Sequence, residues 1–279
     1  MEPRGAGVAI VCVGAAILVA VRIRARRRAH PGFVDGVGCA SGEPYSLHAR
    51  PIVLLLGDSI TQLSFESHGW GAALAAAYAR ERRADVVNRG FSGYTSRLLS
   101  RVVPSVVGQL GQPLERVGLV TILVGSNDAT RPGAAQHVPV DEYEANLSAI
   151  VAMLCATLPA ARVVVITPPA VDEAKFCAVR ESAGKGDGDG RCNARLRPYC
   201  EAAMAVAARH NVALFDLHAR SLATPDWQHR LLADGLHLSG GGNKLLFEGL
   251  SELICTQLPD RSPGGMPWHL PRWNDVRAI

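Results

Sequence analysis

The feature that most constrains the fold is a regular alternation of short aliphatic runs with helical stretches from residue 51 onward. The first run, residues 52–56, is continuously apolar and ends at the polar turn Gly57-Asp58-Ser59. A run of this length that is bounded by a turn is typical of a strand buried on both faces. Strands that alternate with helices form βαβ units, so the chain predicts an α/β fold with a parallel sheet covered by helices on both faces.

The same pattern predicts five strands and five helices. We expect strands over residues 52–56, 86–87 (leading into Asn88-Arg89-Gly90), 119–124, 162–167 and 212–216. We expect helices over residues 71–80, near 96–110, 141–158, 196–210 and 244–257. Asp141, with Glu144 three residues later, is typical of a helix cap. Residues 184–190, rich in Gly and Asp, are expected to form a flexible loop.

Polar turns follow three of the predicted strands. They are Gly57-Asp58-Ser59, Asn88-Arg89-Gly90-Phe91-Ser92-Gly93 and Gly125-Ser126-Asn127-Asp128. The carboxyl ends of parallel strands meet at one edge of a sheet, and ligand sites are built there. A serine at this edge is a candidate nucleophile that needs a base, an orienting acid and donors for an oxyanion.

A fourth polar element, Asp234-Gly235-Leu236-His237, precedes the last helix. With Asp at one position and His three residues later in a turn, the carboxylate can accept from Nδ1 and leave Nε2 for the serine hydroxyl. Each residue also has an ordinary interpretation: Asp234 as a turn cap, His237 as a core histidine, Gly90 as a residue chosen for its φ, Asn127 as part of an Asx turn. Their order on successive strand ends favours catalysis.

These four segments resemble the sequence blocks of the SGNH (GDSL-type) hydrolase superfamily, whose letters correspond here to Ser59, Gly90, Asn127 and His237. Residues 89–97, 166–169, 234–239 and the tail 270–276 are similar to those of the isoamyl acetate-hydrolysing esterase family. The resemblance runs from about residue 51 to residue 276 and does not cover the first 50. The loop at 184–190 departs from it and is interpreted as a local insertion near the rim of the pocket.

The resemblance implies a three-layer α/β/α fold with a five-stranded, mainly parallel, flavodoxin-like sheet. It also implies a small-ester hydrolase in which Ser59 attacks the carbonyl, His237 takes the proton and Asp234 orients the imidazole. The backbone N–H groups of Ser59 and Gly90 and the side-chain amide of Asn127 would hold the oxyanion. Gly90 would be required because no Cβ obstructs the acyl group.

Asp58 and Asp128 are expected to be supporting residues that fix the loops by hydrogen bonds. No cofactor is implied, and scattered histidines without a metal-binding spacing predict no metal. Three alternatives stay open: a lipid hydrolase, an acyltransferase at a membrane surface, and a non-catalytic binding module. Of the aromatic residues, Phe65, Trp70, Phe91 and Trp227 are candidates for a pocket, although most are expected in the core.

Charge and cysteine content exclude some other classes. The net charge of +4 arises from one N-terminal cluster, Arg22, Arg24, Arg26, Arg27 and Arg28, so no nucleic-acid partner is predicted. Seven widely spaced cysteines favour free thiols over a disulfide scaffold, with one local disulfide among Cys177, Cys192 and Cys200 as the alternative. Nothing in the sequence indicates an oligomeric state.

The first 50 residues are predicted to be separate from a hydrolase domain over residues 51–279. Residues 5–21 carry no charge and are followed at once by the arginine cluster. Positive charge after an apolar segment favours an uncleaved membrane anchor with the domain on the cytosolic side. An Arg-rich organelle-targeting segment is the rival interpretation, and a soluble cytoplasmic protein with an inert extension is the third. Glycines and a proline between residues 36 and 44 indicate a linker.

Overall fold

The computed structural model describes residues 45–46, 49–270 and 273. Five strands of this part form one fully parallel sheet in the order β3-β2-β4-β5-β6. Their bounds are β2 (Ile52–Gly57), β3 (Asp85–Gly90), β4 (Val117–Leu123), β5 (Arg162–Ile166) and β6 (Ala213–Phe215). This is the flavodoxin-like order, in which the chain reverses its direction across the sheet after the second strand. The predicted α/β class and sheet are therefore confirmed.

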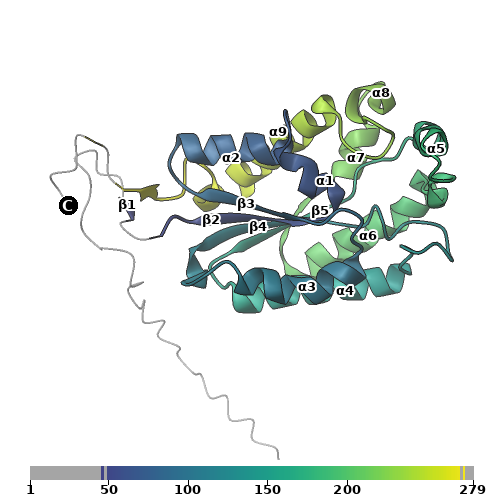
Figure 1. Ribbon diagram of the computed structural model, residues 1–279. Helices are drawn as coiled ribbons and strands as arrows, with labels where there is room; N and C mark the ends of the chain where they lie inside the picture. The colour runs from purple at the N-terminus through teal and green to yellow at the C-terminus, as the bar shows by residue number, and fades with distance from the viewer. Residues whose placement is uncertain (1–44, 47–48, 271–272, 274–279) are drawn as a thin grey trace, which may run out of the picture. The chain divides into compact units, whose positions relative to one another are not determined.

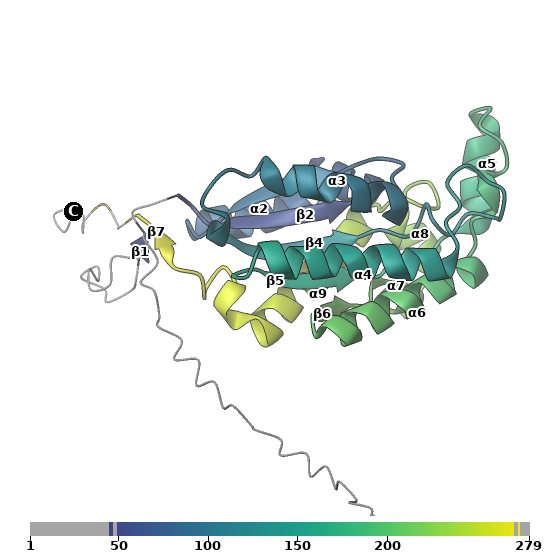
Figure 2. The same cartoon turned by 90° about the horizontal axis from the view of Figure 1, so that it is seen from below.

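Helices cover both faces of the sheet (Figure 1). One face carries α3 (Ser96–Gly108), α4 (Val140–Thr157) and α6 (Asn193–His210). The other carries α2 (Trp70–Arg80), α9 (Gly240–Gln257) and the short α7 (Leu217–Leu222) and α8 (Trp227–Leu231). Figure 2 looks onto the sheet from the side of α4 and α6, and α5 (Glu173–Ser182) stands beyond one end of the sheet.

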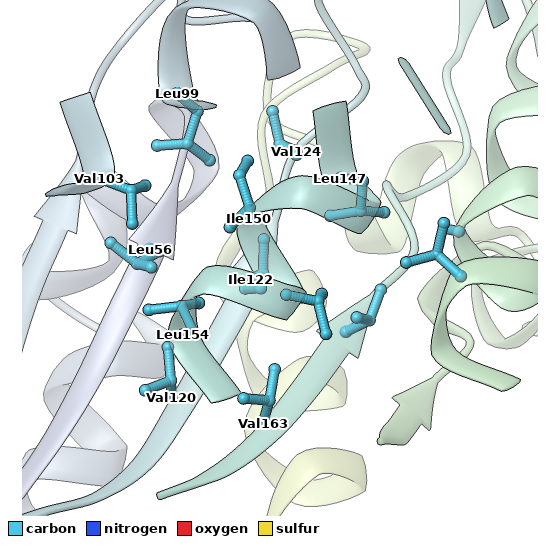
Figure 3. Close-up of a cluster of buried hydrophobic side chains, with 14 of the residues drawn as sticks. Leu56, Leu99, Val103, Val120, Ile122, Val124, Leu147, Ile150, Leu154 and Val163 are labelled. Carbon is cyan, nitrogen blue, oxygen red and sulfur yellow. The ribbon is translucent and has the colours of Figure 1, made fainter. Parts of the chain in front are cut away.

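Alternation along β2 explains why both faces need a cover. Leu54 and Leu56 belong to the core under α3 and α4, whereas Val53 and Leu55 belong to the core under α2 and α9. All four side chains have no exposed surface. Figure 3 shows Leu56 facing Leu99 and Val103 of α3, beside Ile122 of β4 and Leu154 of α4. At about 25 cal/mol per Å² of apolar surface, this burial is the main stabilising contribution to the domain.

The ten predicted elements all occur, with ends that differ by a few residues. The helical cap at Asp141 is wrong: α4 begins at Val140, Pro139 occupies the cap position, and Asp141 lies in the first turn. A negative charge in the first turn still stabilises the helix, because it interacts favourably with the positive end of the helix dipole. The predictions missed α1 (Ser59–Gln62), α5, α7, α8, four 3₁₀ turns, and a parallel pair of β1 (Tyr45–Ser46) with β7 (Trp268–His269). Backbone pairing with the domain thus begins before the predicted boundary at residue 50.

The predicted anchor at residues 5–21 and the arginine cluster lie outside the described residues. Among the helices that are described, none combines the length and apolar character needed to cross a bilayer. The five cysteines of the described part, Cys155, Cys177, Cys192, Cys200 and Cys255, are all free thiols. The alternative of a local disulfide among the three middle cysteines is therefore wrong for this structure.

Candidate active site

Ser59 lies at the carboxyl end of β2, where the strand order reverses. It is the first residue of α1 and is 6% exposed. Asp58 caps this helix, because its Oδ1 accepts the N–H of Ile60 at 2.9 Å. The backbone N–H of Asp58 donates to Leu123 O of β4 at 3.3 Å, which fastens the turn to the next strand. A serine at the first position of a helix leaves its own N–H without a helical acceptor.

His237 and Asp234 reach Ser59 from the loop before α9. The Ser59 hydroxyl lies 2.9 Å from His237 Nε2, across 178 residues of sequence. His237 Nδ1 lies 2.7 Å from Asp234 Oδ2, while Asp234 Oδ1 accepts the backbone N–H groups of Leu236 and His237 at 2.9 and 2.8 Å. The three residues expected to form a serine–histidine–aspartate triad are thus brought together in hydrogen-bonding order.

The hydrogen bonds within the triad shift both pKa values. The hydrogen bond that His237 donates to the Asp234 carboxylate raises the pKa of His237 above its ordinary value, against partial burial, which lowers it. Burial by itself raises the pKa of Asp234, but the hydrogen bonds from the His237 side chain and from backbone N–H groups outweigh it and lower the pKa to about 2. Asp234 is therefore ionised at neutral pH and supports an imidazolium ion.

Asn127 lies in the turn after β4 and is 4% exposed. Its Nδ2 donates to Tyr94 O at 2.9 Å, and its Oδ1 accepts from Arg191 at 3.0 Å. An amide nitrogen carries two hydrogens, so one remains for a further acceptor. Asn127 lines the same cavity as Ser59.

Gly90 occupies a different place from the one predicted. Its single N–H donates to Asn88 Oδ1 at 2.9 Å, and Gly90 does not line the cavity at Ser59. A Cβ at this position would lie 2.0 Å from the backbone nitrogen of Gln62, so the glycine makes room for α1. The expected space for an acyl group is therefore not the reason for this glycine.

Gly93 lines the cavity instead, three residues further along the same turn. It has a φ of +79°, which favours glycine. Its N–H makes no hydrogen bond to any of the described residues. The sequence contains the signal, because two glycines stand in this turn, but spacing alone does not tell which one faces Ser59.

Asp58 and Asp128 are buried beneath the site. Asp128 Oδ1 accepts from the backbone N–H and the hydroxyl of Ser96 at 2.9 and 2.6 Å, which anchors the start of α3. Burial raises the pKa of Asp58 to about 7 and that of Asp128 to about 6. Within the described residues, the second carboxylate oxygen of each has no hydrogen-bond partner. Asp58 and Asp128 each hold a backbone N–H of a neighbouring turn through one carboxylate oxygen.

A cavity of about 270 Å³ opens beside Ser59 and His237. Segments to which the sequence analysis assigned no part in the site also line it: Phe176, Val179, Arg180 and Ala183 of the helix α5 region, together with Gln136 and Arg191. Lys185 lines the cavity as well. Lys185 belongs to the predicted insertion, which the structure places on the rim. Helix α5 has no pronounced apolar stripe, so the pattern that predicts core helices does not reveal it.

The four aromatic residues proposed for the pocket do not line this cavity. Trp70 is fully buried, and its Nε1 donates to Ile60 O at 3.2 Å behind the nucleophile. Phe65 is 44% exposed. Over the described part of the chain, no group of three or more His, Cys, Asp and Glu side chains is arranged to hold a metal ion.

The fold and the site together define a class of hydrolase with a serine at the end of the first sheet strand. Residues 55–245 match the model of the GDSL-like lipase/acylhydrolase family, and the chain belongs to this family. It is a serine ester hydrolase.

Curated relatives cover most of the chain. It is 39% identical over 229 residues to the mouse (Mus musculus) isoamyl acetate-hydrolyzing esterase 1 homolog, which spans 81% of this chain and 88% of the relative. It is 38% identical over 232 residues to a GDSL esterase/lipase of Arabidopsis thaliana, covering 79% and 93% of the two chains.

Solved structures share the fold. A lipase/acylhydrolase from Enterococcus faecalis matches with a TM-score of 0.59 and 24% identity, over 74% of this chain and 96% of that one. A catalytic mutant of an acetylxylan esterase from Geobacillus stearothermophilus matches with a TM-score of 0.55 and 21% identity, over 81% and 100% of the two chains. At these identities the likeness concerns the fold alone.

Proposed function

We propose that this protein hydrolyses small acyl esters through an acyl-enzyme on Ser59. The observation that carries the proposal is the chain of hydrogen bonds from Ser59 through His237 to Asp234, at the mouth of the 270 Å³ cavity. A hydroxyl held at 2.9 Å from a neutral imidazole nitrogen can lose its proton as it attacks a carbonyl.

In the proposed reaction, the Ser59 oxygen forms a bond to the ester carbonyl carbon and its proton passes to His237 Nε2. Asp234, ionised and hydrogen-bonded to Nδ1–H, stabilises the resulting imidazolium. The proton on Nε2 then goes to the departing alkoxide, which leaves as the alcohol. Water, deprotonated by His237, attacks the acyl-enzyme and releases the acid and the serine hydroxyl.

The developing oxyanion needs donors, and we propose the N–H groups of Ser59 and Gly93 with the Nδ2 of Asn127. The first two groups donate no hydrogen bond within the described part of the chain, and Asn127 has an amide hydrogen to spare. Gly93 replaces Gly90 in this proposal because the N–H of Gly90 is bonded to Asn88. One such donor typically accounts for ~10²–10³ in kcat.

The size and lining of the cavity support a short acyl group. Its volume of about 270 Å³ lies at the low end for ligand sites, and only a few apolar side chains line it. Lys185 at its rim disfavours a long hydrocarbon chain, because an apolar chain that covered the ammonium group would remove its water. Acetate esters are the first candidates, in agreement with the names of the curated isoamyl acetate-hydrolyzing relatives.

Acyl transfer to an alcohol is the second candidate. A further cavity of about 360 Å³, lined by Leu63, Asn243 and other residues, also borders Asp234 and His237. An alcohol bound there would be close to the imidazole that must deprotonate it. A binding module without catalysis is disfavoured by the hydrogen-bonded serine, histidine and aspartate.

The test is hydrolysis of p-nitrophenyl acetate, butyrate and octanoate by the full-length chain and by Ser59→Ala. We expect turnover that falls with chain length and is lost in Ser59→Ala. Ser148→Ala is a matched control, because Ser148 also contacts a histidine, His210, at 2.7 Å but lies on α4, away from the cavity. Preference for octanoate would indicate a lipid hydrolase, and ester formation on addition of isoamyl alcohol would indicate a transferase. Turnover that survives Ser59→Ala would refute the mechanism.

We further propose that residues 5–21 anchor the protein in a membrane with the domain facing the cytosol. The support is 17 uncharged residues followed by five closely spaced arginines. Fractionation of cells that express the full chain or a chain without residues 1–30 tests this. Loss from the membrane fraction on deletion is expected, whereas a shortened product in an organelle would favour a targeting segment.

A further inference from the structure

Arg191 is a buried arginine that contacts the candidate oxyanion hole. It lies just before α6, and 5% of its surface is exposed. Its Nη2 donates to Asn127 Oδ1 at 3.0 Å and to Gln136 Oε1 at 2.7 Å, and its Nε donates to Ser126 O at 3.1 Å. Few arginines are buried to this extent, and two of the donor atoms of this one, Nη2 and Nε, are directed at residues of the candidate site and its turn.

The contact fixes which way the Asn127 amide faces. With Oδ1 toward Arg191 and Nδ2 toward Tyr94 O, each end of the amide meets a complementary group. If the amide turned over, its NH₂ would face the donors of Arg191 and its oxygen would face a carbonyl. Both contacts would then be repulsive. Arg191 and the Tyr94 carbonyl therefore hold Nδ2 where it can donate into the cavity.

The same arginine is linked to Gly93. Gln136 accepts from Arg191 through Oε1 and donates from Nε2 to Gly93 O at 2.7 Å. The guanidinium is itself held in place by the ring of Phe176, whose centroid is 5.3 Å away, and by the Asp189 carboxylate at 3.6 Å. A continuous set of hydrogen bonds thus connects the backbone of Gly93 with the side chain of Asn127.

We propose that Arg191 is a positioning residue for the oxyanion hole, which orients and polarises the Asn127 amide and, through Gln136, holds the Gly93 turn. The inference rests on the function proposed above. A cation that accepts electron density through Asn127 Oδ1 makes the Nδ2 hydrogens better donors, and it is in place before the reaction begins. Because the oxyanion exists only in the transition state, the benefit falls on kcat and not on KM.

The proposal predicts the effect of Arg191→Met, which keeps much of the side-chain volume and removes the charge and the donors. Loss of a charge-assisted hydrogen bond is expected to lower kcat for p-nitrophenyl acetate by about 10–100-fold, with KM changed by less than about threefold. Arg197→Met is the matched control: Arg197 lies on the surface of α6, is paired with Glu201, and is expected to leave kcat unchanged.

A double-mutant cycle separates positioning from general disruption. Asn127→Ala alone is expected to lower kcat ~10²–10³-fold. If Arg191 acts through Asn127, Arg191→Met lowers kcat by a smaller factor in the Asn127→Ala background than in the wild type, and the effect that remains there is the part carried by Gln136 and the Gly93 turn. Effects that instead multiply would show independent action and overturn the proposal.

The pH profile separates the effect of the charge of Arg191 from the effect of its hydrogen bonds. The hydrogen bond with Asp234 and the charges of Asp234 and Asp58 raise the pKa of His237, whereas burial and, to a smaller extent, the positive charge of Arg191 lower it. Without Arg191 the pKa of His237 rises, so the acidic limb of kcat/KM moves to higher pH. Arg191→Lys keeps the positive charge but loses the planar set of guanidinium donors. We therefore expect the acidic limb of kcat/KM to stay at its wild-type pH while kcat is still reduced.

Folding is checked for every variant by thermal unfolding and by titration of the active serine with a phosphonate. If Arg191→Met does not fold, Arg191→Lys and Gln136→Leu, which leave the charge in place, test the same contacts. Wild-type kcat in these folded variants, with Ser59→Ala inactive, overturns the inference about Arg191 alone. Hydrolysis that survives Ser59→Ala overturns the proposed function, and the inference with it.

Discussion

Replacing Asp58 by asparagine is expected to make the stability of the domain less sensitive to pH. Asp58 is fully buried, and its pKa is raised by burial from 3.8 to about 7. Only one of its carboxylate oxygens has a hydrogen-bond partner among the described residues. Asparagine can keep the cap on Ile60 N through its own Oδ1 and carries no charge to be desolvated.

The magnitude follows from linkage between protonation and folding. Between pH 3.8 and about 7 the native state holds a proton on Asp58 that the unfolded chain has released, so the free energy of unfolding falls as the pH rises. The free energy of unfolding falls by about 1.4 kcal/mol for each pH unit in this window, so ionising buried Asp58 lowers it by about 4 kcal/mol in total above pH 7. Between pH 5 and pH 8, Asp58 therefore lowers the free energy of unfolding of the wild type by about 3 kcal/mol.

Urea denaturation of the wild type and of Asp58→Asn, at pH 5 and at pH 8, measures this quantity. The stability of the variant relative to the wild type is expected to increase by about 3 kcal/mol from pH 5 to pH 8. Asp141→Asn, at an exposed position in the first turn of α4, is the matched control and is expected to show no such trend. If Asp58→Asn changes the unfolding free energy equally at both pH values, within about 1 kcal/mol, the reasoning is refuted.

Three further outcomes are expected. Asp234→Asn places an amide against His237 Nδ1 and favours the wrong tautomer, so kcat is expected to fall about 10⁴-fold. The pKa of His237 is expected to fall as well, which moves the acidic limb of the remaining activity to lower pH. Profiles of rate against pH check both effects, and a limb that does not move would contradict the raised pKa of His237. Gly90→Ala puts a Cβ 2.0 Å from Gln62 N and is expected to cost about 3 kcal/mol of stability in urea denaturation; a wild-type transition midpoint would show that α1 can move aside. Leu54→Ala is expected to cost about 2–5 kcal/mol in the same assay, and a loss below about 1 kcal/mol would mean that the sheet core repacks.

The sequence predicts the sheet well because strands that are buried on both faces consist of uninterrupted aliphatic residues. Residues 52–56 are aliphatic without interruption, and the structure buries them from both sides. The triad residues are also predictable, since strand ends and an Asp-x-x-His turn determine where their side chains gather. A separation of three residues lets Asp234 and His237 meet in a turn, and the structure has them 2.7 Å apart.

The oxyanion hole and the pocket wall are less predictable, because they depend on contacts between distant segments. The choice between Gly90 and Gly93 depends on where α1 packs against β3, and the sequence of the turn does not state this. Nothing in the sequence around Arg191 distinguishes it from a surface arginine, and only the tertiary structure shows that it is buried against Asn127. Short polar segments such as α5 are held by tertiary contacts and not by an apolar stripe of their own.

The separation of the nucleophile from its base has a consequence for biosynthesis. A chain made from its N-terminus completes Ser59 and β2 long before His237, which follows 178 residues later. Asn243 of α9 accepts the N–H of Trp70 at 3.0 Å, so α2 near the start of the domain is also held by a helix that is made much later. A nascent or prematurely ended chain therefore carries the serine without its activating base. Ester cleavage begins only when synthesis of the domain is nearly finished.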